Sequence, residues 1–300
     1  MIHYSFIIPH KNSPQLLSRC INTIPQRSDI EIIVVDDHSV APLFQPTDLS
    51  IGERTDVTYI CQQESRGAGA ARNKGLAIAQ GKWLVFADAD DYFTDNLNGL
   101  LDKYADDTQL DLVYLNAQVV DNHGVTLPLP ISTYMQNYLD HRLYAEPVLK
   151  FKVFAPWIRM VKRQLVHDRQ LKFDEIFVGN DAIFSLSCSR YAAHFACESA
   201  IIYNYYQPAT GSCTSKYYNQ QNLKSIIDLH FRVNQLYKAA GYHMRCTFLD
   251  KYMALPTQTE EQKQQKAYYL SLLKEHHLSY LSDLYYSLIR VIYKRLKVVM

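Results

Sequence analysis

The chain has 300 residues, 48% of them hydrophobic and 20% charged, with a formal net charge of +1. This composition is that of an ordinary globular protein with enough chain for one large or two modest domains, and the small charge gives no case for a nucleic-acid partner. The six cysteines show no C-x-x-C pair or zinc spacing, and no apolar run reaches the roughly eighteen residues that span a bilayer, so we expect reduced thiols in the cytoplasm.

Strands and helices alternate through the first 120 residues. Short apolar runs predict strands, and helix-favouring runs that follow turn residues predict helices between them. The predicted strands are 4–8, 31–35, 57–61, 83–87 and 112–120, and the predicted helices are about 15–23, 68–79 and 96–104. This alternation implies the α/β class, with a mostly parallel sheet flanked by helices. In such sheets, ligands bind beyond the carboxyl ends of the strands.

Aspartates follow two of these strands. Asp36 and Asp37 close the second strand, and the run from Asp88 to Asp91 (DADD) follows the fourth. Period-two alternation places Asp88 and Asp90 on the same side of the backbone. Carboxylates this close raise each other's pKa unless a cation neutralises them, and a hard divalent ion completed by substrate phosphates is the usual solution. Because D-x-D is a short pattern and Asp is common in turns, a turn of solvated acids remains an alternative.

Three ordered segments make the N-terminal 120 residues similar to a known family. They are SFIIPHKN, EIIVVDDHS and GAGAARNKGLAIAQGKWLVFADADD. These segments resemble the nucleotide-sugar-binding half of family 2 glycosyltransferases, which have the GT-A (Rossmann-like) fold. The resemblance implies transfer of a sugar from a nucleotide-diphosphate donor, with inversion at the anomeric carbon. It favours a UDP-sugar as the donor, and it implies Mn²⁺ or Mg²⁺ as the cofactor.

The resemblance also implies roles for the aspartates at the strand ends. Asp37 would meet the nucleobase, and Asp36 would line the same pocket. Asp88 would lie near the donor sugar or the ribose. Asp90 would be the direct metal ligand and would bridge to the diphosphate. A structural alternative for Asp37 is to cap a helix that follows the second strand.

Three further residues belong to the implied donor site. Pro9 closes the first strand and would shape the backbone around the donor. Arg72 and Asn73 match the A-R-N of the family. Arg72 would either contact the donor or brace the acidic cluster by pairing with a nearby carboxylate.

The acceptor side is implied by segments beyond residue 120. Residues 131–144 are rich in aromatic side chains and predict an irregular flap over the acceptor site. Trp157, in APWIRMVKR, resembles the tryptophan that precedes the catalytic base in the family; it would stack on an acceptor sugar or belong to the core. The family usually has Glu-Asp where this chain has Asn180 and Asp181. Asp181 would be the general base and Asn180 an acceptor-binding residue without the usual charge, although Asp181 is also placed to cap the helix that begins at Ala182.

One carboxylate on the acceptor side suffices for the implied reaction. An inverting transfer needs a base to take the proton of the acceptor hydroxyl as that oxygen attacks opposite the leaving diphosphate. A metal ion neutralises the charge that develops on the diphosphate, so no protein acid is needed there. The two carboxylate positions are therefore Asp90 on the donor side and Asp181 on the acceptor side.

The last part of the chain predicts a strand, a loop and three helices. The strand is 200–206; in the following loop Gln207 replaces the arginine of the family, and Ser212 and Lys216 are candidates for a lid over the donor. The helices are about 222–240, 259–276 and 280–299. The last of them carries four basic residues and no acidic residue after Asp283, so it would either lie on a membrane surface or pack and form a homodimer.

These observations predict a metal-dependent inverting glycosyltransferase that acts on a saccharide or lipid-linked saccharide in surface-polysaccharide synthesis. We divide the chain into a donor half (1–120), an acceptor half with the base (121–220) and a helical extension (221–300). We expect a cytoplasmic protein, alternatively a peripheral one on the inner face of the plasma membrane. The other two functions considered are a sugar-phosphate nucleotidyltransferase, which would need a glycine-rich loop after the first strand, and a non-catalytic nucleotide-sugar-binding scaffold, which Asn180 and Gln207 keep open.

Overall fold

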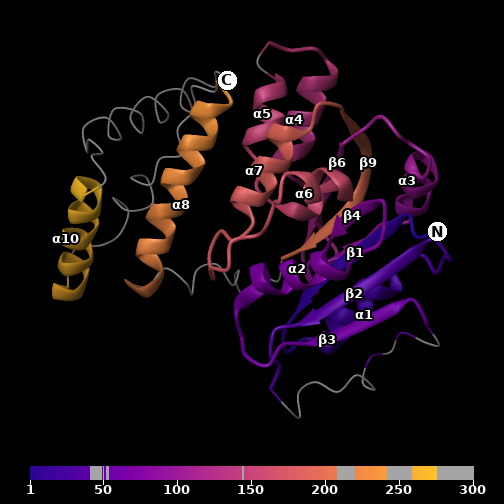
Figure 1. The fold of residues 1–300 in the computed structure, drawn as a ribbon, viewed down its shortest axis with the longest axis horizontal. Helices are drawn as coiled ribbons and strands as arrows, with labels where there is room; N and C mark the ends of the chain where they lie inside the picture. The colour runs from indigo at the N-terminus through magenta and orange to yellow at the C-terminus, as the bar shows by residue number, and fades with distance from the viewer. Residues whose placement is uncertain are drawn as a thin grey trace. The chain divides into compact units, whose positions relative to one another are not determined.

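The computed structural model describes residues 1–40, 49, 51, 54–143, 145–207, 220–241 and 259–275. The chain divides into two compact units, Met1–Ser212 and Cys213–Met300 (Figure 1). The predicted helix 280–299 and the loop residues Ser212 and Lys216 lie outside the described residues.

One sheet organises the first unit. Its strand order is β3-β2-β1-β4-β8-β6-β9-β5, with β7 paired to β6. The strands are β1 (Tyr4–His10), β2 (Ile30–Asp36), β3 (Val57–Cys61), β4 (Trp83–Phe86), β5 (Tyr92–Phe93), β6 (Leu112–Val120), β7 (Thr126–Pro128), β8 (Arg159–Lys162) and β9 (Phe195–Tyr206). The four strands from β3 to β4 are parallel, as predicted. Strand β8 lies antiparallel between β4 and β6, so the sheet as a whole is mixed.

Helices follow the strands as the alternation predicts. They are α1 (Pro14–Asn22), α2 (Gly67–Ile78), α3 (Asn96–Tyr104), α4 (Pro130–Leu139), α5 (Ala145–Phe151), α6 (Arg163–Asp168) and α7 (Ala182–Tyr191), with a 3₁₀ turn at Pro156–Ile158. The predicted irregular flap over 131–144 is wrong, because most of it is α4. Pro130 starts that helix at a position where a missing N–H costs nothing, and Ile131 and Met135 bury the same face.

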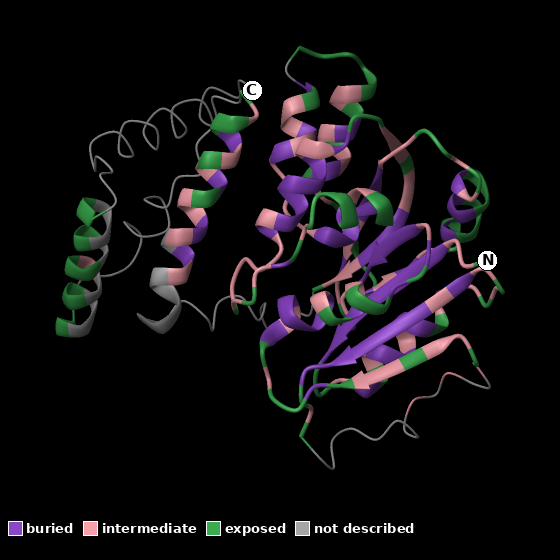
Figure 2. Cartoon of the chain, in the orientation of Figure 1, coloured by how far each residue is buried: buried purple, intermediate pink, exposed green. Residues whose placement is uncertain are grey.

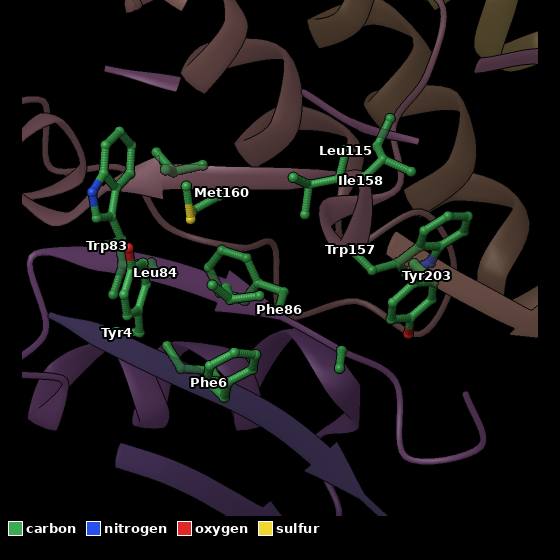
Figure 3. Packing of buried hydrophobic residues seen from close by; sticks show 14 of the residues in the cluster. Tyr4, Phe6, Trp83, Leu84, Phe86, Leu115, Trp157, Ile158, Met160 and Tyr203 are labelled. Atoms are coloured by element: carbon green, nitrogen blue, oxygen red, sulfur yellow. The ribbon is translucent and has the colours of Figure 1, made fainter. Parts of the chain in front are cut away.

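Neighbouring side chains of β1 point to opposite faces of the sheet, and other parts of the chain cover both faces. On one face, α2 approaches so closely that a Cβ on Gly75 would lie 2.6 Å from Ile7. On the other, the Tyr4 hydroxyl donates to the carbonyl of Leu101 in α3, and the Phe6 ring meets Phe93 edge-on. The core continues through β4 and β8 to the aromatic pair of Trp157 and Tyr203 (Figure 3). Burial of this kind, about 25 cal/mol per Å² of apolar surface, fixes the strand ends that carry the polar residues.

The second unit is helical in its described part, with α8 (Gln220–Ala239) beside α10 (Glu260–Glu275). Helix α8 is amphipathic: Ile226, Leu229, Val233 and Tyr237 recur at helical spacing and are buried, and exposed positions alternate with them (Figure 2). Among the described helices, none is long and apolar enough to cross a membrane.

Candidate active site

The polar residues gather where the parallel strands end. Strands β1, β2 and β4 run in the same direction, so Pro9, Asp36 and the turn after β4 reach one edge of the sheet. Pro9 fits this central strand because its nitrogen faces the β4 side, where β4 has already ended. The last hydrogen bond on that side is the one from the N–H of Ala87 to the carbonyl of Ile7, two residues before Pro9. Its missing N–H therefore interrupts no ladder.

Asp36 is the centre of a buried hydrogen-bond network. The Nδ1–H of His10 donates to its carboxylate over 2.8 Å, and the Nε2 of the same ring accepts the N–H of Ser13 over 3.1 Å, which assigns a neutral imidazole. The Ser39 amide and hydroxyl also donate to Asp36. Burial alone would raise the pKa of Asp36, but the hydrogen bonds from Ser39 and His10 outweigh it, so the pKa lies below its usual value.

Asp37 holds the beginning of α2. Its carboxylate accepts the backbone N–H groups of Arg66 and Gly67 (2.7 and 3.0 Å), together with the side chains of Gln62 and Ser65. Gly67 has a φ of +84°, which a residue with a Cβ rarely adopts. Asp37 thus binds the N–H groups at the start of α2, which follows β3 rather than β2, so it does not cap a helix directly after the second strand; contact with a nucleobase stays a prediction.

Two side chains, those of Tyr203 and Arg19, and the backbone N–H of Tyr206 hold the acidic turn after β4. The Asp88 N–H donates to the Tyr203 hydroxyl (2.9 Å), which donates in turn to Asp91 (2.7 Å). The Tyr206 N–H donates to the other oxygen of Asp91, which is fully buried. Arg19 donates to the carbonyl of Asp90 over 2.5 Å. The carboxylate of Asp90 is thus the one in this turn that accepts no hydrogen bond from any other described residue.

The negative charges in this turn repel one another. Burial and the neighbouring Asp88 and Asp90 raise the pKa of Asp91 well above its usual value, and the hydrogen bonds from Tyr203 and Tyr206 offset this in part. Asp90 is exposed, yet the protein packed around its carboxylate and the charge of Asp88 raise its pKa as well. A cation bound at this turn would relieve the repulsion.

Arg72 connects the acidic turn to the candidate base. It is buried in α2, where its Nη2 donates to Asp88 (2.5 Å) and its Nη1 to the amide oxygen of Asn180 (2.9 Å). Its guanidinium also lies over the Phe173 ring, 5.3 Å from the centroid. The bracing alternative for Arg72 is therefore present, and its guanidinium joins the acidic turn to the residue that precedes Asp181.

The segment from Phe173 to Asp181 is held against α2. The amide of Asn73 exchanges hydrogen bonds with the backbone of Phe173, donating over 3.0 Å and accepting over 2.9 Å. Gly69 permits the close approach, because a Cβ there would lie 2.0 Å from the carbonyl oxygen of Asp174. Two residues of the A-R-N match, Arg72 and Asn73, thus hold the segment that ends at Asp181.

Asp181 occupies the N-cap position of α7, but its side chain makes no capping hydrogen bond. Its carboxylate accepts no hydrogen bond from another residue in the described ranges. Burial raises the pKa of Asp181; the positive charge of Arg72 acts against this and the negative charge of Asp88 adds to it. A carboxylate that is left unengaged and has a raised pKa is suited to take a proton.

Trp157 lies among aromatic side chains. Its indole stacks on the rings of Tyr203 and Tyr205, with centroids 4.9 and 5.5 Å away, and 9% of the residue is exposed. Figure 3 shows it packed directly against Tyr203. The core alternative for Trp157 is thus present, and stacking on an acceptor sugar stays a prediction.

Sequence reasoning did not single out His10, Arg19 or Tyr203, which hold the aspartates in place. His10 lies two residues from a predicted strand end and pairs across 26 positions, and Tyr203 meets Asp91 across 112. Neither distance leaves a local signal. The strand periodicity of 200–206 gave the one available hint for Tyr203, since it places alternate tyrosines on one face.

No group of three or more His, Cys, Asp or Glu among the described residues is arranged to hold a metal ion by itself. A divalent cation that binds through one or two carboxylates and the phosphates of its substrate needs no such group. The unengaged carboxylate of Asp90, beside Asp88, fits that type of site. Metal dependence therefore stays a prediction.

A sheet whose parallel strands end in an acidic turn, with a further aspartate on a segment that is tied to that turn, is the arrangement expected of GT-A glycosyltransferases. The sequence matches the family model Glycosyl transferase family 2 over residues 5–169, more than half of the chain. The chain therefore belongs to glycosyl transferase family 2, as predicted.

Similar proteins include EpsH of Bacillus subtilis and the succinoglycan biosynthesis protein ExoO of Rhizobium meliloti. Each is 26% identical to this chain over 67% of it, and the matches cover 60% of either protein. The chain thus spans less than two thirds of these relatives. Among solved structures, residues 1–349 of Staphylococcus aureus TarS in complex with UDP-GlcNAc superpose with a TM-score of 0.63 at 18% identity, over 84% of this chain and 70% of that one. This likeness confirms the predicted fold.

Proposed function

We propose that this chain transfers a sugar, with inversion, from a UDP-sugar to a hydroxyl of a saccharide or lipid-linked saccharide during the synthesis of a cell-surface polysaccharide. The observation that carries the proposal is the Arg72 bridge, which joins Asp88 in the acidic turn to Asn180 beside Asp181. Support for the donor and the pathway comes from the relatives: ExoO is a succinoglycan biosynthesis protein, and TarS has been crystallised with UDP-GlcNAc.

On the acceptor side, Asp181 takes the proton of the attacking hydroxyl. Burial makes its carboxylate a stronger base than a solvated aspartate, and the nearby Arg72 keeps enough of it ionised to act. Asn180 holds Arg72 through its amide oxygen and lies beside the acceptor. Trp157 supports this side through its stack with Tyr203 and Tyr205, and it would present an edge to the acceptor sugar.

On the donor side, Asp90 would hold Mn²⁺ or Mg²⁺, and Asp88 would lie next to it. When bound, such an ion neutralises the charge that develops on the leaving diphosphate. The carboxylates of Asp36 and Asp37 already accept several protein hydrogen bonds, so they would shape the nucleobase pocket by fixing the loops around it. Pro9, at the end of β1, would form the floor of this pocket.

The first experiment is calorimetry with UDP, GDP, CDP and dTDP, each with and without Mn²⁺. We expect UDP to bind in the presence of metal and to lose that binding in Asp90→Ala. Binding of no nucleotide diphosphate under any metal condition would contradict the donor site. A non-catalytic scaffold would bind donor equally in the wild type and in Asp181→Asn, with no turnover in either protein.

A further inference from the structure

Arg19 makes a set of contacts that its position on α1 does not require. It lies in the last turn of this helix, yet its guanidinium reaches the acidic turn and donates from Nη2 to the carbonyl of Asp90 over 2.5 Å. This bond holds the peptide that follows the Asp90 carboxylate. The same turn is fixed on either side, at Asp88 by Arg72 and at Asp91 by Tyr203.

The guanidinium of Arg19 lies over two aromatic rings. Its Cζ lies 4.6 Å from the centroid of Tyr92 and 4.5 Å from that of Tyr206. Tyr92 belongs to β5, directly after the acidic turn, and Tyr206 ends β9, where its N–H also donates to Asp91. The stack therefore ties α1, β5 and the end of β9 to one point beside Asp90.

The hydrogen bonding of Arg19 is incomplete. Its Nε is buried and has no hydrogen-bond partner among the described residues. A buried donor without a partner is unfavourable. The contacts that orient the guanidinium are the two tyrosine rings and the Asp90 carbonyl. A lysine would place one charge here but could not stack flat on two rings.

We propose that Arg19 is a positioning residue: with its guanidinium over the Tyr92 and Tyr206 rings, it holds the Asp90 peptide and so orients the Asp90 carboxylate for the metal–diphosphate part of the donor. This inference rests on the proposed function, because it assumes that Asp90 holds the metal. Groups that orient a metal ligand without touching the ion typically change metal affinity by about 10–100-fold when removed.

Arg54 offers a matched control. It is also an arginine that anchors the end of α1, donating to the carbonyls of Ile21 and Ile24 over 3.0 and 2.7 Å. It also donates to the carbonyl of Pro25 and to the carboxylate of Asp56. Asp56 precedes β3 at the amino end of the parallel strands, whereas the acidic turn lies at their carboxyl end. Substitution of Arg54 should disturb α1 without disturbing Asp90.

The test is a titration of the full chain with Mn²⁺ in the presence of UDP. Binding is measured by calorimetry and by the electron paramagnetic resonance signal of free Mn²⁺. We expect Arg19→Lys to weaken the metal-dependent binding of UDP by about 10–100-fold. Arg54→Lys should bind as the wild type does, although both variants lower the thermal midpoint. Tyr92→Leu, which removes one ring and keeps the hydrogen bond, should give a smaller loss that is not additive with Arg19→Lys.

Each result has a distinct meaning. Wild-type affinity in Arg19→Lys, or an equal loss in Arg54→Lys, would overturn the role of Arg19 and leave the proposed function standing. Should the wild type itself show no metal-dependent binding of UDP, the proposed donor site would fail, and the inference on Arg19 would fail with it. If Arg19→Lys does not fold, Tyr92→Leu takes its place: weaker metal-dependent binding of UDP would support the role of Arg19, and wild-type affinity would overturn it.

Discussion

Asp181 is the proposed general base on the acceptor side. It stands at the N-cap of α7 without using its carboxylate there, and the pKa of that carboxylate is raised by burial. Removal of its charge in Asp181→Asn should lower the rate of donor turnover by about 10²–10⁴-fold, the usual contribution of a general base. Release of nucleoside diphosphate measures this rate. The stability of the variant should not fall, because no capping bond is lost.

The pH profile gives an independent check on the same residue. The base must be ionised to act, so activity should fall as the pH drops through the pKa of Asp181. Since burial raises that pKa, the acid limb should lie above the range of a solvated aspartate, about 3.9. An acid limb at or below this value would contradict the assignment.

Asn180 allows the charge around the base to be changed by one atom. It accepts a hydrogen bond from Arg72, whose positive charge lowers the pKa of Asp181. In Asn180→Asp a second carboxylate competes for Arg72 and repels Asp181, so the acid limb should move to higher pH. The rate well above that limb should recover toward the wild-type value. Asn180→Gln adds no charge and should leave the limb in place; an unmoved limb in Asn180→Asp would show that Arg72 does not couple to the base.

At the scale of elements, α2 and the segment from Phe173 to Asp181 are fitted to each other through Gly69. A Cβ at this position would lie 2.0 Å from a backbone oxygen, which cannot rotate away as a side chain can. Gly69→Ala should therefore displace the segment that bears the base, lower donor turnover and destabilise the protein by roughly 1–3 kcal/mol. Thermal unfolding and turnover measure the two effects.

Gly99 in α3 is the matched control for this substitution. It is also a helical glycine, and nothing lies within 4 Å of a Cβ placed on it. Gly99→Ala should stabilise the protein slightly, because alanine is the better helix former by roughly 0.5–1 kcal/mol. Equal behaviour of the two variants would mean that close packing at Gly69 does not matter.

The elements most accurately predicted are those whose signals are local. The strand at 57–61 and the helix at 96–104 have the bounds that their apolar patterns gave. The aromatic-rich run 131–144 predicts an irregular segment rather than α4, whose first residue, Pro130, is a residue that also starts helices. The antiparallel position of β8 was not foreseen, since the pairing of Trp83 with Lys162 joins residues 79 positions apart and no local pattern encodes it.

The site shows the same division. Short motifs mark Asp88, Asp90 and Asp181, and Arg72 ties Asp88 to Asn180, the neighbour of Asp181. What holds the acidic turn, Tyr203 on Asp91 and Arg19 on Asp90, comes from β9 and α1 and depends on how the whole sheet is assembled. Short motifs thus indicate the residues proposed to carry the chemistry, and tertiary packing determines which residues hold them.

For the whole molecule, the acidic turn lowers the stability of the ligand-free protein, and the same turn is the proposed cation site. Three carboxylates lie within four residues, and the pKa values of Asp90 and Asp91 are both raised. A carboxyl group whose pKa is raised on folding favours the native state most at low pH. Its contribution is lost as the pH climbs from the unfolded value of about 3.9 to the folded one. At neutral pH the protein without ligand therefore carries an electrostatic cost at this turn, and a bound cation would remove it.

Neutralising Asp90 should separate the two roles. In Asp90→Asn no hydrogen bond from another described residue is lost and the repulsion falls, so the ligand-free protein at pH 7 should be as stable as the wild type or more stable by a few tenths of a kcal/mol, since Asp90 is exposed and screened by solvent. The rise in thermal midpoint that Mn²⁺ and UDP produce together should disappear.

Asp91→Asn is the contrast: the buried carboxylate that accepts from Tyr203 and Tyr206 is disrupted, so stability should fall by roughly 1–3 kcal/mol. Thermal unfolding of the three proteins, with and without Mn²⁺ and UDP, measures all of this. A ligand-free Asp90→Asn protein that is clearly less stable than the wild type would mean that Asp90 serves the fold, and that the metal site must be sought elsewhere.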